Sequence, residues 1–285
     1  MTRLRAGTHE IDLSTPCVMG ILNVTADSFY DGGRLDSGAA LAYARRMIVD
    51  GARIIDVGGE STRPNATPVD EAEELARVIP TVGALARDGI CVSIDTMKPA
   101  VMRAALEIGA SMINDVRALQ APGALALAAG SGAAVCLMHM QGGPATMQRA
   151  PAYAAVVTEV RAFLSRRAQA CIDAGISADR IVVDPGFGFG KSLAHNLDLL
   201  RNLDELTGLG YPVLAGLSRK GTLGVITGRD VDDRLAGSIA AALAAVTRGA
   251  RILRVHDVRE TVDALAVWSA VEAWPGGSTQ RWTEK

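Results

Sequence analysis

Short and almost continuously apolar runs recur along the chain, separated by longer stretches in which apolar residues follow a helical period. Strands that are buried on both faces of a parallel sheet show continuous apolar runs, whereas half-exposed strands alternate. The runs predicted to be such strands are 17–24, 53–59, 90–96, 111–116, 133–140, 180–186, 212–218 and 251–257. The helices predicted between and after them are 38–50, 67–85, 99–108, 122–129, 153–172, 193–206, 232–248 and 258–273.

The helix that starts near residue 67 has an explicit N-terminal signal. Thr67 is a suitable cap residue, Pro68 follows at the first helical position, and Asp70 stands three residues after the cap. This order of residues is typical of a helix N-terminus. We therefore expect the helix to be capped at Thr67.

Eight strand-then-helix units without a compositional break predict one (β/α)₈ TIM barrel in the α/β class. From Asn23 to Arg254 the ends of the predicted strands are spaced by an average of 33 residues. An open doubly wound sheet is the alternative, and the near-equal repeats favour the closed barrel. We expect the barrel domain to span residues 1–273, with residues 1–15 forming a short β-hairpin at the barrel bottom, and residues 274–285 to be a flexible tail.

Composition narrows the class of protein. With 285 residues, of which 49% are hydrophobic, the chain can bury a large core, which excludes a disordered protein. No apolar run reaches the roughly 20 residues that a membrane span needs, and the first residues lack the apolar region of a secretory signal. The net charge of −2 argues against a general nucleic-acid surface. We expect neither a membrane nor a nucleic-acid partner.

The four cysteines do not form a C-x-x-C pair, and most of them lie inside apolar runs. A free cysteine in such a run behaves as a small hydrophobic residue. We therefore expect reduced core cysteines and a cytoplasmic protein. The cysteines are Cys17, Cys91, Cys136 and Cys171.

Polar side chains stand at or just after the end of each predicted strand. The carboxyl ends of the strands of a (β/α)₈ barrel converge on one face, where catalysis takes place in such enzymes. Eight polar ends are hard to explain by packing alone, so the sequence predicts a pocket on this face. Its residues are Asn23, Asp56, Asp95, Asn114, His139, Asp184, Ser218 with Lys220, and Arg254 with His256.

The predicted pocket has an acidic and a cationic half. Buried carboxylates are costly unless donors pair with them, so Asp56, Asp95 and Asp184, with Asn114, suggest a ligand head rich in N–H groups, such as an aminopyrimidine edge. Alternatively, Asp56 and Asp95 pair with cations of the site itself. The cationic half predicts a phosphate or pyrophosphate site. It comprises Arg63, Arg219, Lys220, Arg254 and His256, with Asn23 beside them.

Several other chemistries lack their motif. The segment GFGFGKS (186–192) is not a P-loop, because Pro185 stands where that motif needs glycine. The histidines show no metal-binding spacing, and no G-x-S-x-G elbow is present. A Schiff-base aldolase using Lys220 stays open on these residues alone.

Read together, eight segments resemble the motifs of the dihydropteroate synthase family, in the family's order and over nearly the whole chain. Ala26 stands where the family usually has proline, and Asn65 where glycine is common. The matching segments are MGILNVTADSFYDGG (19–33), DVGGESTRPN (56–65), SIDT (93–96), IND (113–115), MHMQGGPATMQ (138–148), DPGFGFGK (184–191), GLSRKG (216–221) and RVHDV (254–258).

The resemblance implies a transferase of folate biosynthesis. It would condense 6-hydroxymethyl-7,8-dihydropterin pyrophosphate with p-aminobenzoate, giving 7,8-dihydropteroate and pyrophosphate. The family requires Mg²⁺, is the target of sulfonamides, and forms homodimers through late barrel helices. The catalytic residues implied are Asp95, Lys220, Arg254 and His256.

The resemblance also implies three sets of binding residues. The pterin set is Asp56, Asp95, Asn114, Asp184 and Lys220. The p-aminobenzoate set is Thr62, Arg63, Pro64, Phe189 and Ser218. The pyrophosphate set is Asn23, Arg63, Arg254 and His256, with Asn23 also the metal ligand.

The implied reaction predicts an SN1-like mechanism, and two other classes of pterin-binding protein are alternatives. An aromatic amine is neutral at pH 7 and needs no general base, so pyrophosphate departure is the demanding step and an SN1-like substitution is expected. A corrinoid methyltransferase that binds methyltetrahydrofolate shares the pterin pocket but has no pyrophosphate to hold, which the cationic residues argue against. A non-catalytic pterin-binding paralogue would be expected to have lost Asp95, Lys220 or His256, and all three are present.

Overall fold

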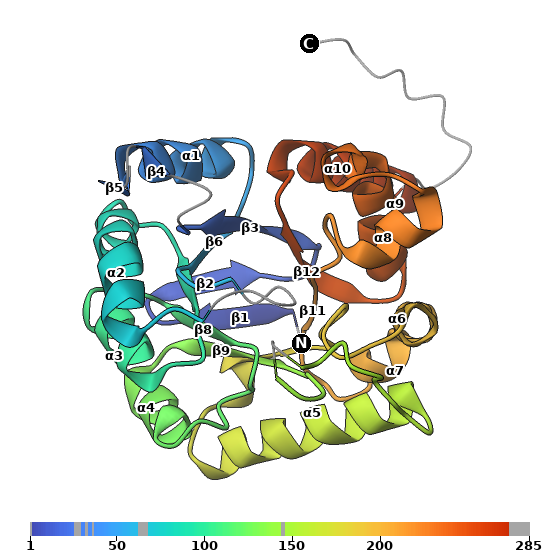
Figure 1. The fold of residues 1–285 in the computed structure, drawn as a ribbon, viewed down its shortest axis with the longest axis horizontal. Helices are drawn as coiled ribbons and strands as arrows, with labels where there is room; N and C mark the ends of the chain where they lie inside the picture. The colour runs from blue at the N-terminus through green and yellow to red at the C-terminus, as the bar shows by residue number, and fades with distance from the viewer. Residues whose placement is uncertain are drawn as a thin grey trace.

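The computed structural model describes residues 2–25, 30–31, 34–35, 37–61, 68–143 and 146–273. Among them, eight parallel strands close into a barrel, surrounded by helices (Figure 1), which confirms the predicted (β/α)₈ fold. Around the barrel the strands are β3 (Cys17–Asn23), β6 (Ile54–Gly58), β7 (Val92–Asp95), β8 (Met112–Asp115), β9 (Ala134–Met138), β10 (Ile181–Asp184), β11 (Val213–Ala215) and β12 (Ala250–Val255). A small antiparallel pair, β4 (Tyr30–Asp31) and β5 (Arg34–Leu35), follows β3.

Helices follow the strands, mostly as predicted. Each buries one side against the barrel, so the main core lies between the strands and the helix ring. The helices are α1 (Ser37–Val49), α2 (Glu71–Arg87), α3 (Pro99–Glu107), α4 (Ala124–Ser131), α5 (Val156–Asp173), α6 (Leu193–Arg201), α7 (Asp204–Thr207), α8 (Gly221–Thr227), α9 (Leu235–Thr247) and α10 (Val258–Glu272).

Two helix predictions were wrong in detail, and one helix was missed. Helix α2 is capped by Asp70, whose side chain accepts a hydrogen bond from the Glu73 N–H at 2.7 Å, and Thr67 lies outside the described residues. The helix expected over 193–206 is interrupted at Asn202 and divides into α6 and α7. Helix α8 was missed, because its seven residues include two glycines and are too few to show a helical period.

The predicted hairpin closes the amino-terminal end of the barrel. Strands β1 (Arg3–Ala6) and β2 (His9–Asp12) pair with Leu4 opposite Ile11, and the hairpin lies across the centre of the ring in Figure 1. Its apolar residues join a second core inside the barrel, with residues near the strand starts such as Cys17 and Ile54. The polar strand ends therefore lie at the opposite end of the barrel.

The cysteines are free and buried, as predicted. Three of them, Cys17, Cys91 and Cys136, belong to the core inside the barrel, and Cys171 lies on α5. Over the described ranges, no helix has the length and hydropathy that a membrane span requires. The expected tail, 274–285, lies outside the described residues.

Truncating the hairpin side chain Leu4 tests its role as a plug. Leu4 is fully buried, so Leu4→Ala should lower the free energy of unfolding by about 2–5 kcal/mol through lost burial and the cavity left behind. Val49→Ala is the control, because Val49 is 82% exposed and its truncation should change stability by less than about 0.5 kcal/mol. Urea unfolding of both variants measures the difference, and equal small effects would show that the hairpin packs loosely.

Candidate active site at the carboxyl ends of the barrel strands

Buried polar side chains gather where the barrel strands end, as the sequence predicted. Asp56 on β6, Asp95 on β7 and Asn114 on β8 occupy neighbouring strands, and Asp184 ends β10. All four are buried, and Asp56 is completely so. Strand pairing sets this arrangement, since Asp95 lies opposite both Gly58 and Asn114 in the barrel register.

One guanidinium joins two of these carboxylates. Arg254 on β12 donates from Nε to Asp56 Oδ2 and from Nη2 to Asp95 Oδ2, each at 2.6 Å. Asn114 adds a third bond, from Nδ2 to Asp56 Oδ2 at 3.0 Å. The prediction was therefore wrong in separating Arg254 from the acids, because this guanidinium belongs to both the acidic and the cationic half of the pocket. The alternative, that Asp56 and Asp95 pair with a cation of the site, is confirmed.

Each of these carboxylates keeps one oxygen without a partner. Asp56 Oδ1 and Asp95 Oδ1 are buried and accept no hydrogen bond from the part of the chain that the structure describes. A buried acceptor without a donor costs free energy, on the order of 1–3 kcal/mol and more for a charged group. The arrangement thus favours a ligand that brings N–H donors.

Burial and the bridge shift the acidities of the bridged groups. Burial raises the pKa of Asp95 to about 7, with Arg254 opposing the shift and Asp56 adding to it. Burial alone would lower the pKa of Arg254, but the carboxylates of Asp56 and Asp95 more than offset this and raise it. Asp95 therefore has a proton equilibrium near neutrality, while Arg254 stays charged.

The carboxylate of Asp184 faces the loop that follows β10. Burial raises the pKa of Asp184, and a hydrogen bond from the Gly186 N–H, at 2.7 Å to Oδ1, opposes the shift. Lys220 donates from Nζ to the Phe187 carbonyl and lies over the ring of Phe189, 4.3 Å from its centroid. Burial lowers the pKa of Lys220 to about 8, and the Asp184 charge limits that fall.

Ser218 and His256 lie together beyond the ends of β11 and β12. Ser218 Oγ is 3.0 Å from His256 Nδ1 and accepts a bond from the His256 backbone N–H at 3.2 Å. Ser218 therefore orients the imidazole. Arg219, expected among the cations of the pocket, instead forms an ion pair with Asp257. The prediction that Arg219 belongs to the cationic half was wrong, because its guanidinium is paired with Asp257.

Some predicted residues lie outside the described part of the chain, and another, Asn23, lies near the bridge. Thr62, Arg63 and Pro64, together with Ala26 and Asn65, lie outside the described residues. Asn23 ends β3 half-buried, and its Oδ1 and Asp95 Oδ2 both lie near Gly58. Over the described ranges, no three or more His, Cys, Asp or Glu side chains gather as a metal site would require.

Lys191 is a buried residue of the site region that sequence reasoning missed. Its Nζ lies 3.0 Å from Nδ1 of His139, which had been placed at the end of β9. The motif DPGFGFGK ends on this lysine, and a lysine that closes a glycine-rich loop at a strand end was the available signal.

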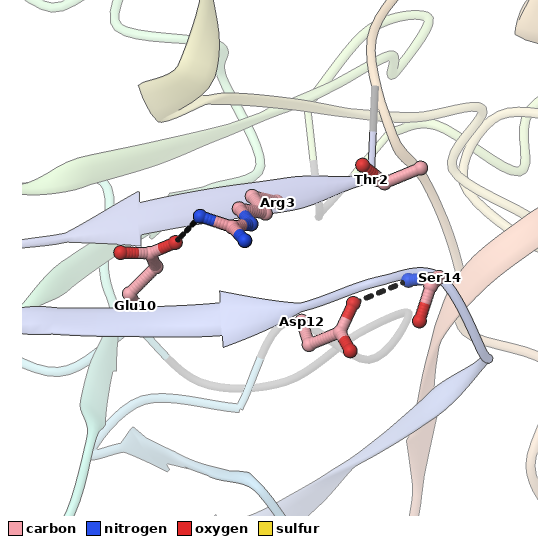
Figure 2. A pocket seen from close by; sticks show the side chains of 5 residues that line it. All are labelled: Thr2, Arg3, Glu10, Asp12 and Ser14. Atoms are coloured by element: carbon pink, nitrogen blue, oxygen red, sulfur yellow. Dashed lines mark hydrogen bonds and ion pairs between the residues drawn. The ribbon is translucent and has the colours of Figure 1, made fainter.

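A cavity also exists at the other end of the barrel. It measures about 420 Å³ and is lined by hairpin residues Thr2, Arg3, Glu10, Asp12 and Ser14 (Figure 2). Arg3 pairs with Glu10 at 2.8 Å, and Asp12 accepts from the Ser14 N–H at 2.8 Å. These charges are satisfied within the hairpin, so the cavity lacks the open acceptors of the barrel mouth.

Comparison with known proteins agrees with this geometry. A family model described as "Pterin binding enzyme" matches residues 19–256. The chain is 52% identical over 270 residues to the dihydropteroate synthase of Haemophilus influenzae, covering 94% of this chain and 98% of that protein. It is 51% identical to the dihydropteroate synthase of Escherichia coli K12, covering 94% and 96%.

Solved structures show the same similarity. Dihydropteroate synthase of Xanthomonas albilineans with 4-aminobenzoic acid superposes with a TM-score of 0.91 at 52% identity, covering 96% of this chain and 99% of that one. The Yersinia pestis enzyme in a sulfonamide drug complex gives a TM-score of 0.91 at 48% identity, covering 95% and 100%. A further Xanthomonas albilineans structure, in complex with 7,8-dihydropteroate, gives 0.88 at 50% identity, covering 96% and 100%.

Removing the bridging cation should make stability depend more steeply on pH. In Arg254→Met, Asp95 loses the charge that opposes its raised pKa, so the folded state should bind its proton up to a higher pH than the wild type does. A raised carboxyl pKa gives stability that is lost as pH rises through the folded-state value. We expect Arg254→Met to lose stability between pH 6 and pH 8.5 by about 1 kcal/mol more than the wild type.

Urea unfolding at both pH values measures this difference. Arg219→Met is the matched control, because it removes a partly exposed arginine of the rim that is paired with Asp257. It should cost about 0–1 kcal/mol without changing the slope. Parallel pH dependences for Arg254→Met and the wild type would contradict the assignment.

Proposed function

The chain belongs to the dihydropteroate synthase family of pterin-binding enzymes, and on that premise we propose how the barrel mouth performs this transferase reaction. The reaction joins 6-hydroxymethyl-7,8-dihydropterin pyrophosphate to p-aminobenzoate and releases pyrophosphate. The observation that carries the proposal is the Asp56–Arg254–Asp95 bridge, which leaves one buried oxygen of each carboxylate without a hydrogen-bond partner among the described residues.

The pterin head fits the acidic part of the mouth. Its amino and ring N–H groups are donors, and Asp56 and Asp95 each have a buried acceptor oxygen that no described residue of the chain donates to. Asp184 and Lys220 lie on the other side, where their opposite charges influence each other's pKa. Asn114 completes the set and is held by Asp56. A planar donor-rich ring would satisfy the groups that the protein leaves open.

The amine substrate lies next to the loop after β10. The ring of Phe189 is held beneath Lys220 Nζ and offers an aromatic wall for p-aminobenzoate. Ser218 belongs to the same pocket, and its hydroxyl forms a hydrogen bond with His256 Nδ1 that fixes the position of both side chains. Thr62, Arg63 and Pro64 would complete this pocket, where sulfonamides compete. The 4-aminobenzoic acid and sulfonamide complexes of the relatives support p-aminobenzoate as the amine substrate.

Pyrophosphate and Mg²⁺ belong to the cationic side, with Asn23, Arg63, Arg254 and His256. Mg²⁺ is commonly bound by few protein groups, with water and substrate phosphates as its other ligands. Asn23 fits that role, because its half-buried amide oxygen lies near the Asp95 carboxylate. When bound, the metal supplies positive charge that neutralises the leaving group.

The substitution proceeds by departure before attack. The C–O bond to pyrophosphate breaks with its electron pair staying on the leaving oxygen, and the methylene becomes a cation conjugated to the pterin. Asp95 stabilises this cation electrostatically, which also favours its deprotonated form near neutral pH. The amine lone pair of p-aminobenzoate then forms the C–N bond, and the nitrogen releases its proton to solvent.

The reaction is tested by measuring pyrophosphate and 7,8-dihydropteroate with each component omitted in turn. We expect product only when protein, Mg²⁺, the pterin pyrophosphate and p-aminobenzoate are all present. Asn23→Ala should raise the Mg²⁺ concentration needed for half-maximal rate by about tenfold, the loss of one metal ligand. Tight pterin binding without turnover would identify a non-catalytic paralogue, and methyl transfer without pyrophosphate release a methyltransferase.

Isotope exchange in the same assay tests the order of bond changes. Without p-aminobenzoate, bridging oxygen label should scramble into non-bridging positions of the pterin pyrophosphate, because departure is reversible. The absence of scrambling, with pyrophosphate released only when p-aminobenzoate is present, would contradict the SN1-like order.

A homodimer through the late helices is part of the proposal. Helices α8, α9 and α10 lie side by side (Figure 1) and expose Val225 and Ile226 on α8 and Val267 and Val271 on α10. Exposed apolar side chains on neighbouring helices favour association with a second protein surface.

Val267→Lys tests the dimer. It should convert the dimer to a monomer in sedimentation velocity, because a two-fold interface receives the charge twice. Val49→Lys, at an 82% exposed position on α1, should leave the dimer intact. A wild-type protein that sediments as a monomer would contradict the proposal.

We also place the protein in the cytoplasm. The buried, reduced cysteines support this location, since disulfides are uncommon there. Cell fractionation tests it, and recovery from a secreted or membrane fraction would contradict it.

A further inference from the structure

A buried lysine outside the proposed substrate contacts organises the loop between β10 and α6. Lys191 is only 3% exposed. Its Nζ donates to the carbonyl oxygens of His139 at 3.2 Å, Gly186 at 3.0 Å and Phe189 at 3.0 Å. His139 Nδ1 lies at 3.0 Å as a fourth neighbour. One ammonium group thus ties the loop to the end of β9.

Each carbonyl of the loop 186–190 accepts a side-chain hydrogen bond. Lys191 donates to the carbonyls of Gly186 and Phe189, and three other side chains donate to the remaining carbonyls. These bonds are Lys220 Nζ to Phe187, Gln148 Nε2 to Gly188 at 2.6 Å, and Tyr153 Oη to Gly190 at 2.8 Å. The loop conformation is therefore imposed from outside the loop.

Two glycines allow the loop to press against the backbone after β9. Gly186 and Gly190 adopt φ values of +68° and +61°, which disfavour other residues. A Cβ at Gly186 would overlap the His139 carbonyl oxygen, and one at Gly190 would overlap that of Gln141. The close approach brings the His139 and Gly186 carbonyls within reach of the same ammonium.

The ammonium of Lys191 holds both ends of the turn from Gly186 to Phe189. The Phe189 N–H donates to the Gly186 carbonyl at 3.1 Å, and both the Gly186 and Phe189 carbonyls accept from Lys191. We propose that Lys191 is a positioning residue that acts through Phe189 to shape the p-aminobenzoate pocket. This inference rests on the proposed function.

The three N–H donors of a charged Lys191 match the three carbonyl acceptors around it. Its three backbone neighbours are acceptors, and His139 can accept as well, because burial and Lys191 lower the pKa of His139 to about 3 and keep the imidazole neutral. Burial and the charge of Lys220 lower the pKa of Lys191 to about 7, and the charge of Asp184 opposes that fall. Three N–H donors are available for the three carbonyls only in the ammonium form.

The first test is Lys191→Met, which keeps side-chain length and removes the donors. We expect KM for p-aminobenzoate to rise by about tenfold, the scale of one lost hydrogen bond to a charged group, with KM for the pterin substrate changed less than about twofold. Arg180→Met is the matched control. Arg180 is a buried cation that donates to the Ala133 and Ala128 carbonyls at 2.9 and 3.1 Å, at the amino-terminal end of the barrel. It should lose stability without a change in either KM.

A double-mutant cycle with Phe189→Ala identifies the route of the effect. If Lys191 acts through Phe189, Lys191→Met adds no further rise in KM once the ring is absent. Additive effects, or an unchanged KM for p-aminobenzoate in Lys191→Met, would overturn the inference. Should Lys191→Met not fold, Lys191→Gln, which retains two donors, serves the same cycle. Failure of the wild type to form 7,8-dihydropteroate would instead count against the proposed function.

Discussion

The bridge from Arg254 to Asp56 and Asp95 is the interaction on which the barrel mouth depends. Two carboxylates on neighbouring strands are buried together, and without a cation between them their repulsion and desolvation would prevent both from staying charged. Arg254 can serve both because its planar fork presents several donors at once. Register across the closed barrel, which pairs β12 with β3 and β3 with β6, brings the three residues into reach.

The bridge explains why the site is stable and still able to bind. Arg254 satisfies one oxygen of each carboxylate, and within the described ranges nothing donates to the other, so the site retains acceptors that suit a donor-rich ligand. Natural proteins commonly accept such local costs at functional sites and offset them elsewhere. Here the apolar plug of the hairpin and the helix ring supply the remaining stability, away from the mouth. The hydrogen bonds of Lys191 to the loop after β10 add a second constraint, because they hold Phe189 in place through its backbone.

Much of the fold could be predicted because its signals are local. Continuous apolar runs located the barrel strands to within three residues at each end, with β3 and β10 close to their predicted ranges and β11 ending three residues early. Polar residues at strand ends identified Asp56, Asp95, Asn114 and Asp184, since closure of the barrel alone brings them together. The side-chain pairings within the site could not be predicted, because they depend on side-chain geometry. Residue spacing left the pairing of Asp56 and Asp95 with a cation of the site as an alternative, but could not show that Arg254 is that cation or that Arg219 pairs with Asp257. Lys191 closes a glycine-rich loop in the sequence, but its role depends on buried acceptors that only the structure shows.

The central claim is that pterin and amine substrates meet at this mouth, with the pterin donors on the buried carboxylates. A crystal structure of the protein with a non-reactive pterin pyrophosphate analogue and p-aminobenzoate tests it most directly. We expect pterin N–H groups within hydrogen-bond distance of the carboxylate oxygens that Arg254 does not contact, and the amine substrate against Phe189. A pterin bound elsewhere, for example in the hairpin cavity of Figure 2, or one that displaces Arg254 from both carboxylates, would contradict it.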